Sequence, residues 1–221
     1  MMDNYLKKEL YTLIQNDSSI FEFIQSGSLD GIWYWDIEKP ENEWMSSKFW
    51  ETLGYDPNQK AHLSSEWQDI IFVEDLEVAK RNFELHCNNA NHPYDQVVRY
   101  RHKNGSTVWI RCRGMAVRDK SGKAIRMLGA HTDISGLKAA EVEISRLKEE
   151  YEMVFNGTQD AMFLIKVEGY NEFRYIRNNH AHQVKTGIGL DQIKGKTPKE
   201  LLGDELASIV EKNYKDRKSV V

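Results

Sequence analysis

The most chemically reactive side chains in this sequence are two cysteines and one neighbouring histidine. His86 and Cys87 are adjacent, whereas Cys112 lies in a separate segment, so the cysteines lack C-x-x-C spacing. This pattern predicts neither a zinc site nor a disulfide framework, and it fits a reducing compartment. The sequence also contains no P-loop, no G-x-G-x-x-G motif and no Ser/His/Asp or Cys/His arrangement in a recognisable context. We therefore expect no catalytic residues and no metal site in these residues.

Length and composition are those of an ordinary globular protein. The 221 residues are 40% hydrophobic and 29% charged, which leaves room for two domains of modest size. A formal net charge of −4, without a cluster of Lys and Arg, argues against a nucleic-acid binder. The opening segment MMDNYLKKELYTLIQND has no uninterrupted apolar core, so it predicts neither a signal peptide nor a membrane segment. The expected location is the cytoplasm.

Hydrophobic periodicity and turn residues predict an α+β fold. The expected strands are residues 31–38, 42–47, 94–102, 107–119 and 124–134, and the expected helices are residues 3–15, 17–25, 47–54, 64–72 and 75–89. The turns Lys-Asn-Gly at 103–105 and Asp-Lys-Ser-Gly at 119–122 predict hairpins between the last three strands. These elements make a five-stranded antiparallel sheet with short helices on one face.

The second half of the chain repeats the first. Residues 26–33 (SGSLDGIW) and 156–163 (NGTQDAMF) align without gaps. A strand pair at 161–178 and a short helix at 179–187 follow, but the repeat stops where its last three strands should begin. A period of this length indicates duplicated domains rather than a solenoid.

Several motifs of the first copy resemble the PAS family of sensor domains. They are Leu53-Gly54-Tyr55, Lys103-Asn104-Gly105, Trp109-Ile110, Arg118-Asp119-x-x-Gly122 and Asp133-Ile134-Ser135-x-x-Lys138-x-x-Glu141. The last of these is quite specific to the family and its PAC segment. One departure is the segment 72–75 (FVED), which replaces the His-Pro-x-Asp common in the family, so no role for that histidine is carried over. In the second copy, Asn179-x-Ala181 and Thr186-Gly187 resemble the same family.

The resemblance implies a domain organisation. An N-terminal amphipathic helix (1–19) precedes a PAS domain with its PAC segment (20–136), and a coiled-coil-like signalling helix (137–155) leads to the N-terminal half of a second PAS domain (156–215). Residues 216–221 (DRKSVV) match the in-frame translation of a widely used DNA sequencing adapter. We therefore expect this tail to be non-native and the natural protein to continue into an output domain.

The helix after the first domain carries a heptad seam. Its apolar positions alternate steps of three and four: Leu137, Ala140, Ile144, Leu147, Tyr151 and Val154. We expect a parallel dimeric helix, and a second dimer contact through the helix at 3–15, so the expected partner is a second copy of this chain. The alternative is a solvated connector helix, because two to three heptads are a short run.

The strand–helix junction is the expected point of signal relay. Ser135 is expected to cap the helix through its hydroxyl, with Asp133 at the junction. The resemblance implies that this Asp ties the junction to the core, so that a strand movement tilts or twists the helix. The expected relay residues are Asp133, Ile134, Ser135, Leu137, Ile144 and Leu147.

The resemblance also implies a ligand pocket between the sheet and the short helices. On the strand 107–119, Val108, Ile110 and Cys112 share one face, which we expect to face the helices. The candidate pocket residues are Trp33, Trp35, Trp44, Phe49, Trp67, Ile70, Phe83, Val98, Tyr100 and Ile110. The alternative is plain core packing, since such aromatic clusters are usually core.

The sequence supports neither haem nor flavin as the cofactor, which stays unknown. Haem in this family would need an axial histidine on or near the long helix, and His86 at the end of that helix is a weak ligand signal. A partly exposed histidine there also interacts favourably with the helix dipole. Flavin photoreceptors would need an Asn-Cys motif on the preceding helix, where neither cysteine lies.

These patterns predict the sensory input region of a bacterial signalling protein, which senses a small molecule or a partner. The expected output is a diguanylate cyclase domain, because residues 193–198 (IKGKTP) resemble PAS repeats that precede such domains. A histidine kinase is the alternative output. A ligand-free PAS module for dimerisation or protein interaction is the alternative of a different class.

Overall fold

The computed structural model describes residues 5–168 and 172–217, and the chain divides into two compact units, Met1–Ala140 and Glu141–Val221. Within the described residues, the helices are all too short or too polar to cross a membrane. Of the tail expected to be non-native, the backbone of residues 216 and 217 continues the last helix, and residues 218–221 lie outside the described part.

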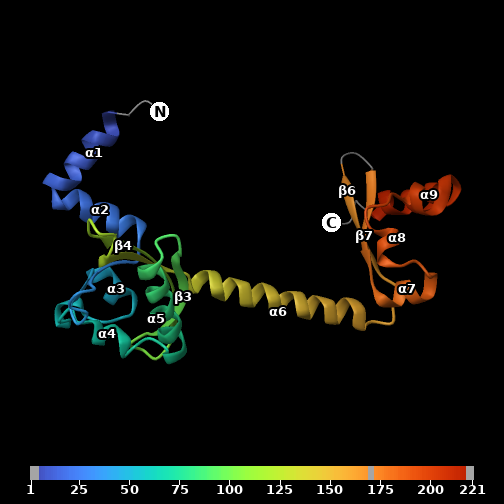
Figure 1. The fold of residues 1–221 in the computed structure, drawn as a ribbon. Helices are drawn as coiled ribbons and strands as arrows, with labels where there is room; N and C mark the ends of the chain where they lie inside the picture. Colours follow the sequence, from blue (N-terminus) through green and yellow to red (C-terminus); the bar gives the residue numbers. More distant parts are fainter. Residues whose placement is uncertain (1–4, 169–171, 218–221) are drawn as a thin grey trace. The chain divides into compact units, whose positions relative to one another are not determined.

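The first unit is built on a five-stranded antiparallel sheet (Figure 1). Its strands are β1 (Gly31–Asp36), β2 (Glu43–Met45), β3 (Tyr94–Arg101), β4 (Thr107–Arg118) and β5 (Ala124–Asp133). They lie in the order β2-β1-β5-β4-β3, so the first hairpin pairs with the last strand of the meander. Gly105 and Gly122 adopt φ values of +90° and +88° in the two meander turns, a backbone region that glycine occupies without steric cost. The expected α+β fold is confirmed.

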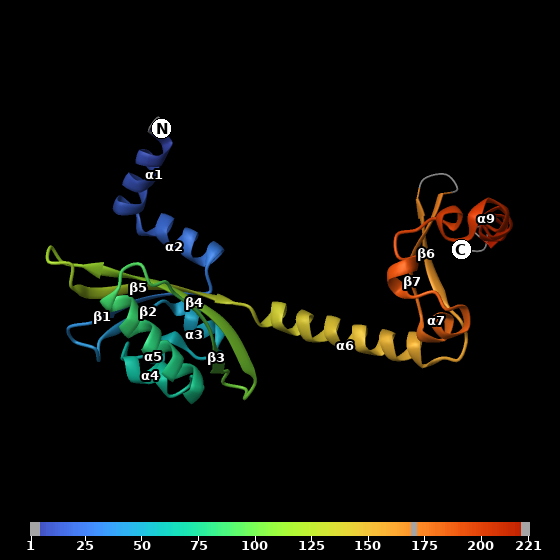
Figure 2. The same cartoon turned by 45° about the vertical axis from the view of Figure 1, so that its right-hand side comes forward.

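The helices of the first unit are α1 (Tyr5–Asn16), α2 (Ser18–Ser28), α3 (Ser47–Thr52), α4 (Ser64–Gln68) and α5 (Val73–Asn88), with one 3₁₀ turn at Pro57–Gln59. Figure 2 shows α3, α4 and α5 together on one face of the sheet. The edge of β3 is held to this helical layer by backbone hydrogen bonds from Phe72 N to Arg99 O and from Arg101 N to Ile70 O.

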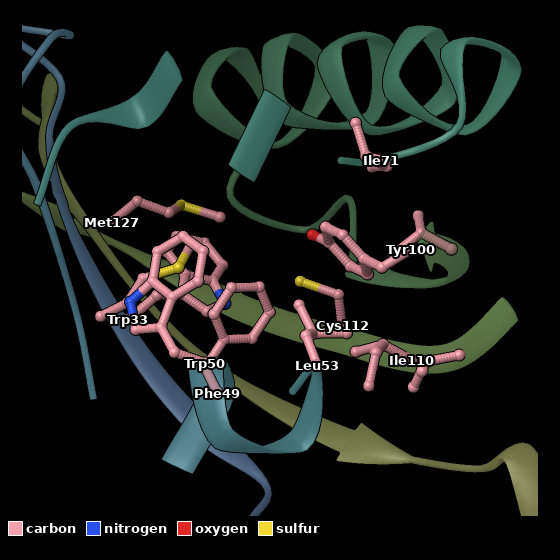
Figure 3. Packing of buried hydrophobic residues seen from close by; sticks show 12 residues of the cluster. Trp33, Phe49, Trp50, Leu53, Ile71, Tyr100, Ile110, Cys112 and Met127 are labelled. Atoms are coloured by element: carbon pink, nitrogen blue, oxygen red, sulfur yellow. The ribbon is translucent and has the colours of Figure 1, made fainter. Parts of the chain in front are cut away.

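The core lies between the sheet and these helices. Val108, Ile110 and Cys112 of β4 are buried, which confirms the predicted inward face of that strand. They join Trp33 of β1 and Met127 of β5 in one cluster, which α3 completes with its own aromatic residues. Figure 3 shows Phe49 and Trp50 of α3 gathered near Trp33 and Met127, with Tyr100 and Cys112 projecting from their strands into the same layer.

The second unit contains the hairpin of β6 (Phe163–Glu168) and β7 (Glu172–Asn178), followed by α7 (His180–Thr186), α8 (Leu190–Ile193) and α9 (Pro198–Arg217). Two of its hydrogen bonds repeat a pair in the first unit. Met162 exchanges two bonds with Asn179, the residue before α7, as Ile32 does with Ser46, the residue before α3. Gly187 after α7 has a φ of +71° and Gly54 near the end of α3 has +78°. The two segments share the same local architecture.

A helix of 23 residues, α6 (Ser135–Gly157), begins in the first unit and ends in the second. Its last turns are fixed within the second unit. The side-chain amide of Asn179 donates to Phe155 O at 3.0 Å, and the guanidinium of Arg177 makes two hydrogen bonds to the carboxylate of Glu152, at 2.8 and 2.9 Å. The end of α6 is therefore part of the second unit's fold.

Candidate functional site

A cavity of about 110 Å³ lies between the inner face of the sheet and helices α4 and α5. Six of the ten candidate pocket residues line it: Trp33, Trp35, Trp67, Phe83, Val98 and Tyr100. Phe49 and Ile110 are fully buried in the surrounding core without lining the cavity, and Ile70 packs against that core while its neighbour Ile71 lines the cavity. The cavity is therefore built from the aromatic cluster that the sequence singled out.

Trp44 does not belong to this cavity, which corrects the sequence-based prediction. Its side chain is 43% exposed, and its strand neighbours Glu43 and Met45 are buried instead. Successive side chains of a strand point to opposite faces, so only one of these two sets can face the core. The register pairs Trp33 with Met45 and Trp35 with Glu43, and this pairing directs Trp44 to the outer face beside Tyr34.

The most unusual lining group is the carboxylate of Glu43. Its side chain is buried, and its Oε2 accepts a hydrogen bond of 2.6 Å from the indole Nε1 of Trp67. Burial raises the pKa of this carboxyl from 4.5 to about 7, with the Trp67 bond opposing part of the rise. Glu43 therefore changes charge near neutral pH inside an aromatic cavity.

Two further buried polar side chains line the cavity. His131 of β5 is neutral at physiological pH, because burial lowers its pKa from 6.5 to about 3. Its Nδ1 has no hydrogen-bond partner among the described residues. Gln96 of β3 is oriented by Asn82, whose Nδ2 donates to Gln96 Oε1 at 2.7 Å, and this leaves Gln96 Nε2 without a partner in the same part of the chain. Buried polar groups of this kind are normally satisfied by a partner, so each marks a position where a ligand or water can bind.

Sequence reasoning missed these polar residues because it searched for pocket residues among aromatic and aliphatic side chains. The signal that identifies Glu43 is the alternation of a short strand. With Trp33 facing inward in β1, the hairpin places Met45 and Glu43 on the same face. His131 is two residues from Gly129, and both belong to the inward positions of β5.

Cys112 also lines the cavity, but it is not a nucleophile. Burial raises the pKa of its thiol from 9.0 to about 12, so the reactive thiolate is not populated at neutral pH. This position differs from the partly exposed, electropositive sites that activate cysteines.

His86 is buried rather than partly exposed, which corrects the sequence-based interpretation. Its Nδ1 donates to His92 O, and its Nε2 accepts from the backbone N–H of Ala116 at 3.0 Å. Both ring nitrogens are therefore occupied in joining α5 to β4. The residue has a structural role at the end of the helix.

The strand–helix junction is a compact set of hydrogen bonds around Asp133. Its backbone N–H donates to Asp30 Oδ2 at 2.7 Å, and its carboxylate Oδ1 accepts from Ser135 N at 2.8 Å. The carbonyl oxygen of Trp109 in β4 accepts from Ile134 N at 2.8 Å. The junction thus connects the first turn of α6 to β4, to β5 and to the segment before β1.

Asp133, and not Ser135, caps the start of α6, which corrects the sequence-based expectation. The Ser135 hydroxyl oxygen instead accepts from Trp109 N at 2.9 Å, on the side facing the sheet. A carboxylate acceptor at a helix N-terminus also interacts favourably with the helix dipole. Asp133 therefore stabilises the helix start while Ser135 attaches it to β4.

The apolar seam of α6 is largely exposed on the single chain. Leu137, Ile144, Leu147 and Val154 have between 50% and 68% of their surface accessible. Intrahelical ion pairs join Arg146 to Glu143 at 2.8 Å and to Glu150 at 3.0 Å. The seam is thus a line of exposed apolar side chains with ion-paired charged side chains on the same helix.

Known proteins share the architecture of the first unit. Residues 42–131 match the family model described as PAS fold. Comparison with curated proteins gives no match. Among solved structures, a sensory box histidine kinase/response regulator from Burkholderia thailandensis E264 is 25% identical, with a TM-score of 0.50, covering 59% of this chain and 96% of its own.

Two further structures have lower scores. The N-terminal domain of a diguanylate cyclase with PAS/PAC sensor from Marinobacter aquaeolei is 23% identical, with a TM-score of 0.41, over 48% of this chain and 94% of its own. The PAS domain from the fruit-fly ELK potassium channel is 15% identical, with a TM-score of 0.41, over 53% and 96%. The sheet order and the helical layer of the first unit agree with the family match over residues 42–131, so the first unit of this chain has the PAS fold.

Proposed function

We propose that this chain is the sensory input region of a bacterial signal-transduction protein. The cavity of the PAS domain responds to a small ligand, and α6 carries the response toward an output domain. The observation that carries this proposal is the junction at Asp133, because the last strand of the sheet continues into α6 through side-chain hydrogen bonds that also involve β4 and the segment before β1. A shift of β5 therefore acts directly on the first turn of the helix.

Removal of the Asp133 carboxylate is expected to uncouple the sheet from the helix. Asp133→Ala deletes the acceptor of Ser135 N, which costs about 1 kcal/mol of stability and leaves the sheet folded. Amide hydrogen exchange is expected to become faster at residues 135–138 while β4 and β5 stay protected. In the intact signalling protein, the output should no longer follow the input.

Asp133→Asn is the matched control, since an asparagine keeps a side-chain acceptor at this position. It is expected to retain slow exchange at the helix start. Unchanged exchange at residues 135–138 in Asp133→Ala, or unchanged signalling, would contradict the relay role of this residue.

The second element of the proposal is a dimer formed by the seam of α6 with a second copy. Ile144 and Val142 are both β-branched and 67% and 70% exposed, but only Ile144 lies on the seam. Ile144→Lys is expected to convert a dimeric chain to a monomer, because it places a charge in the apolar contact. Val142→Lys is the control and should leave the dimer intact. Sedimentation equilibrium of the full chain measures both.

A wild-type chain that sediments as a monomer at high concentration would exclude this dimer. Equal dissociation by both lysine variants would show that charge in general, and not the seam, controls association. We also place the helix at 3–15 at the dimer contact, where Leu10 and Leu13 of α1 are exposed.

The output domain is proposed to be a diguanylate cyclase, on the basis of residues 193–198 in the second unit. The similarity to a sensory box histidine kinase favours a histidine kinase as the second candidate. The natural sequence downstream distinguishes the two. A Gly-Gly-Asp-Glu-Phe run supports the first candidate, and a phospho-accepting histidine on a dimerisation helix supports the second.

The modest volume of the cavity favours a different class of function as another candidate, a PAS module that binds a protein partner and no small ligand. The absorbance spectrum and the native mass of the purified full chain discriminate between these functions. A bound small molecule supports ligand sensing, and an empty stable dimer supports the interaction module.

A further inference from the structure

We propose that the cavity of the PAS domain binds a small organic cation, with the Glu43 carboxylate as its counter-ion and the surrounding aromatic rings as its walls. This inference rests on the proposed sensory function and names the chemical class of the ligand. The charge, the wall chemistry and the size of the cavity support it.

The titratable groups that line the cavity decide its charge. Besides Glu43 they are Lys80, Tyr94, Tyr100, Cys112 and His131. The ammonium of Lys80 lies 3.3 Å from the carboxylate of Glu77, and both side chains are more than half exposed. The charge of Lys80 is therefore solvated and paired outside the buried part of the cavity. Burial keeps His131 neutral and holds the pKa of both tyrosines and of Cys112 above their usual values. Glu43 is therefore the one buried charge-bearing group of the described cavity lining.

Glu43 has no cationic partner among the described residues. A carboxylate offers about four acceptor positions, and the structure gives its side chain one hydrogen bond, from Trp67 to Oε2. A buried carboxylate without a cation is costly, and either a proton or a bound cation removes that cost. A cationic ligand supplies the missing partner.

The wall chemistry is suited to a cation. Six aromatic rings line the cavity: Trp33, Trp35, Trp67, Phe83, Tyr94 and Tyr100. The faces of such rings carry partial negative charge and attract ammonium and guanidinium groups, most strongly at tryptophan. Trp35 lies directly opposite Glu43 in the β1–β2 pairing, and Trp67 donates to its carboxylate, so two indoles flank the charge.

The cavity volume limits the ligand to a few atoms. The cavity of about 110 Å³ is somewhat smaller than an engineered cavity of about 150 Å³ that holds benzene. A ligand of roughly six non-hydrogen atoms is therefore the upper range for the cavity in this form. The buried Nε2 of Gln96, 8% exposed as a residue and without a partner in the described chain, is a donor that a bound water or an acceptor atom of the ligand can satisfy.

A matched pair of probes tests this inference. Cyclopentylamine and cyclopentanol have the same number of non-hydrogen atoms and differ in charge at neutral pH. Isothermal titration calorimetry of the full chain at pH 7.5 is expected to show at least a tenfold preference for the amine. In Glu43→Gln this preference should disappear. Glu41→Gln, an exposed neighbour on the same hairpin, should keep it.

Each other outcome overturns the inference. If cyclopentanol binds as tightly as cyclopentylamine, the cavity does not select a cation. That result would overturn this inference but would remain compatible with a sensory cavity for a neutral ligand. A preference that persists in Glu43→Gln would show that this carboxylate does not recognise the charge. Absence of amine binding to the wild-type chain would also refute it. Failure of the Asp133 test, in contrast, would overturn the relay and leave amine binding unaffected.

Discussion

Gly129→Ala is expected to produce the largest loss of stability of any single methyl group added to the PAS domain. Gly129 of β5 pairs directly with Trp33 of β1, and a Cβ at this position would lie 2.1 Å from Cε2 of the Trp33 indole. The ring cannot move away, because Trp33 is buried against Tyr94, with ring centroids 5.8 Å apart. Overpacking of this kind typically costs 1–3 kcal/mol and occasionally more, and we expect about 3 kcal/mol here.

Urea denaturation followed by tryptophan fluorescence measures this loss. Gly136→Ala is the control, since Gly136 lies in the first turn of α6, where a Cβ would meet no described atom within 4 Å beyond the adjoining helix backbone. A helical glycine replaced by alanine is expected to be neutral or to stabilise by up to about 1 kcal/mol. Equal denaturation midpoints for Gly129→Ala and the wild type would show that Trp33 does not occupy the space above Gly129.

The second large effect is a dependence of stability on pH caused by Glu43. Its pKa is about 7 in the folded chain against an ordinary value of 4.5. Between these values the folded state holds a proton that the unfolded state has released, so stability falls as pH rises through this window. The accumulated cost above pH 7 is roughly 3 kcal/mol. Glu43→Gln removes this cost and keeps an acceptor for Trp67, so the variant should be more stable than the wild type at pH 8 and similar near pH 4.5.

The quantity to measure is the difference in the free energy of unfolding between the wild type and Glu43→Gln at each pH. The difference is needed because His131 changes stability with pH in the opposite direction to Glu43. Its pKa is lowered from 6.5 to about 3, so the unfolded state binds a proton first and stability is lost as pH falls through that window. This contribution is common to the wild type and to Glu43→Gln and cancels in the difference. A difference between them that does not change from pH 4.5 to pH 8 would contradict the raised pKa of Glu43.

The elements of the PAS domain follow from the sequence where local signals are strong. The glycine turns at Gly105 and Gly122 set both hairpins of the meander, since each requires a positive φ. The alternation of Val108, Ile110 and Cys112 identifies the inward face of β4, because a strand exposes alternate side chains to opposite faces. These features depend on neighbours within a few residues.

Prediction is weaker for the cavity and the junction. Aromatic character predicts an inward Trp44, whereas the register of β1 and β2 directs Glu43 inward. The position of Ser135 at the start of a helix predicts a capping role for its hydroxyl. In the structure this hydroxyl instead accepts a hydrogen bond from the backbone N–H of Trp109, 26 positions earlier in the chain. A helix end predicts a partly exposed His86, but the approach of β4 at Ala116 buries it.

The amino-acid sequence by itself determined the order of strands and helices, the hairpin turns, the aromatic content of the core and the apolar seam of α6. All of these follow from periodicity and backbone preference within short windows. Only the tertiary structure decided which side chains share the cavity, and that Glu43 is buried there beside Trp67. Burial and partnership depend on strands brought together from distant parts of the chain, and a buried charge acquires its shifted pKa only after that assembly removes it from water.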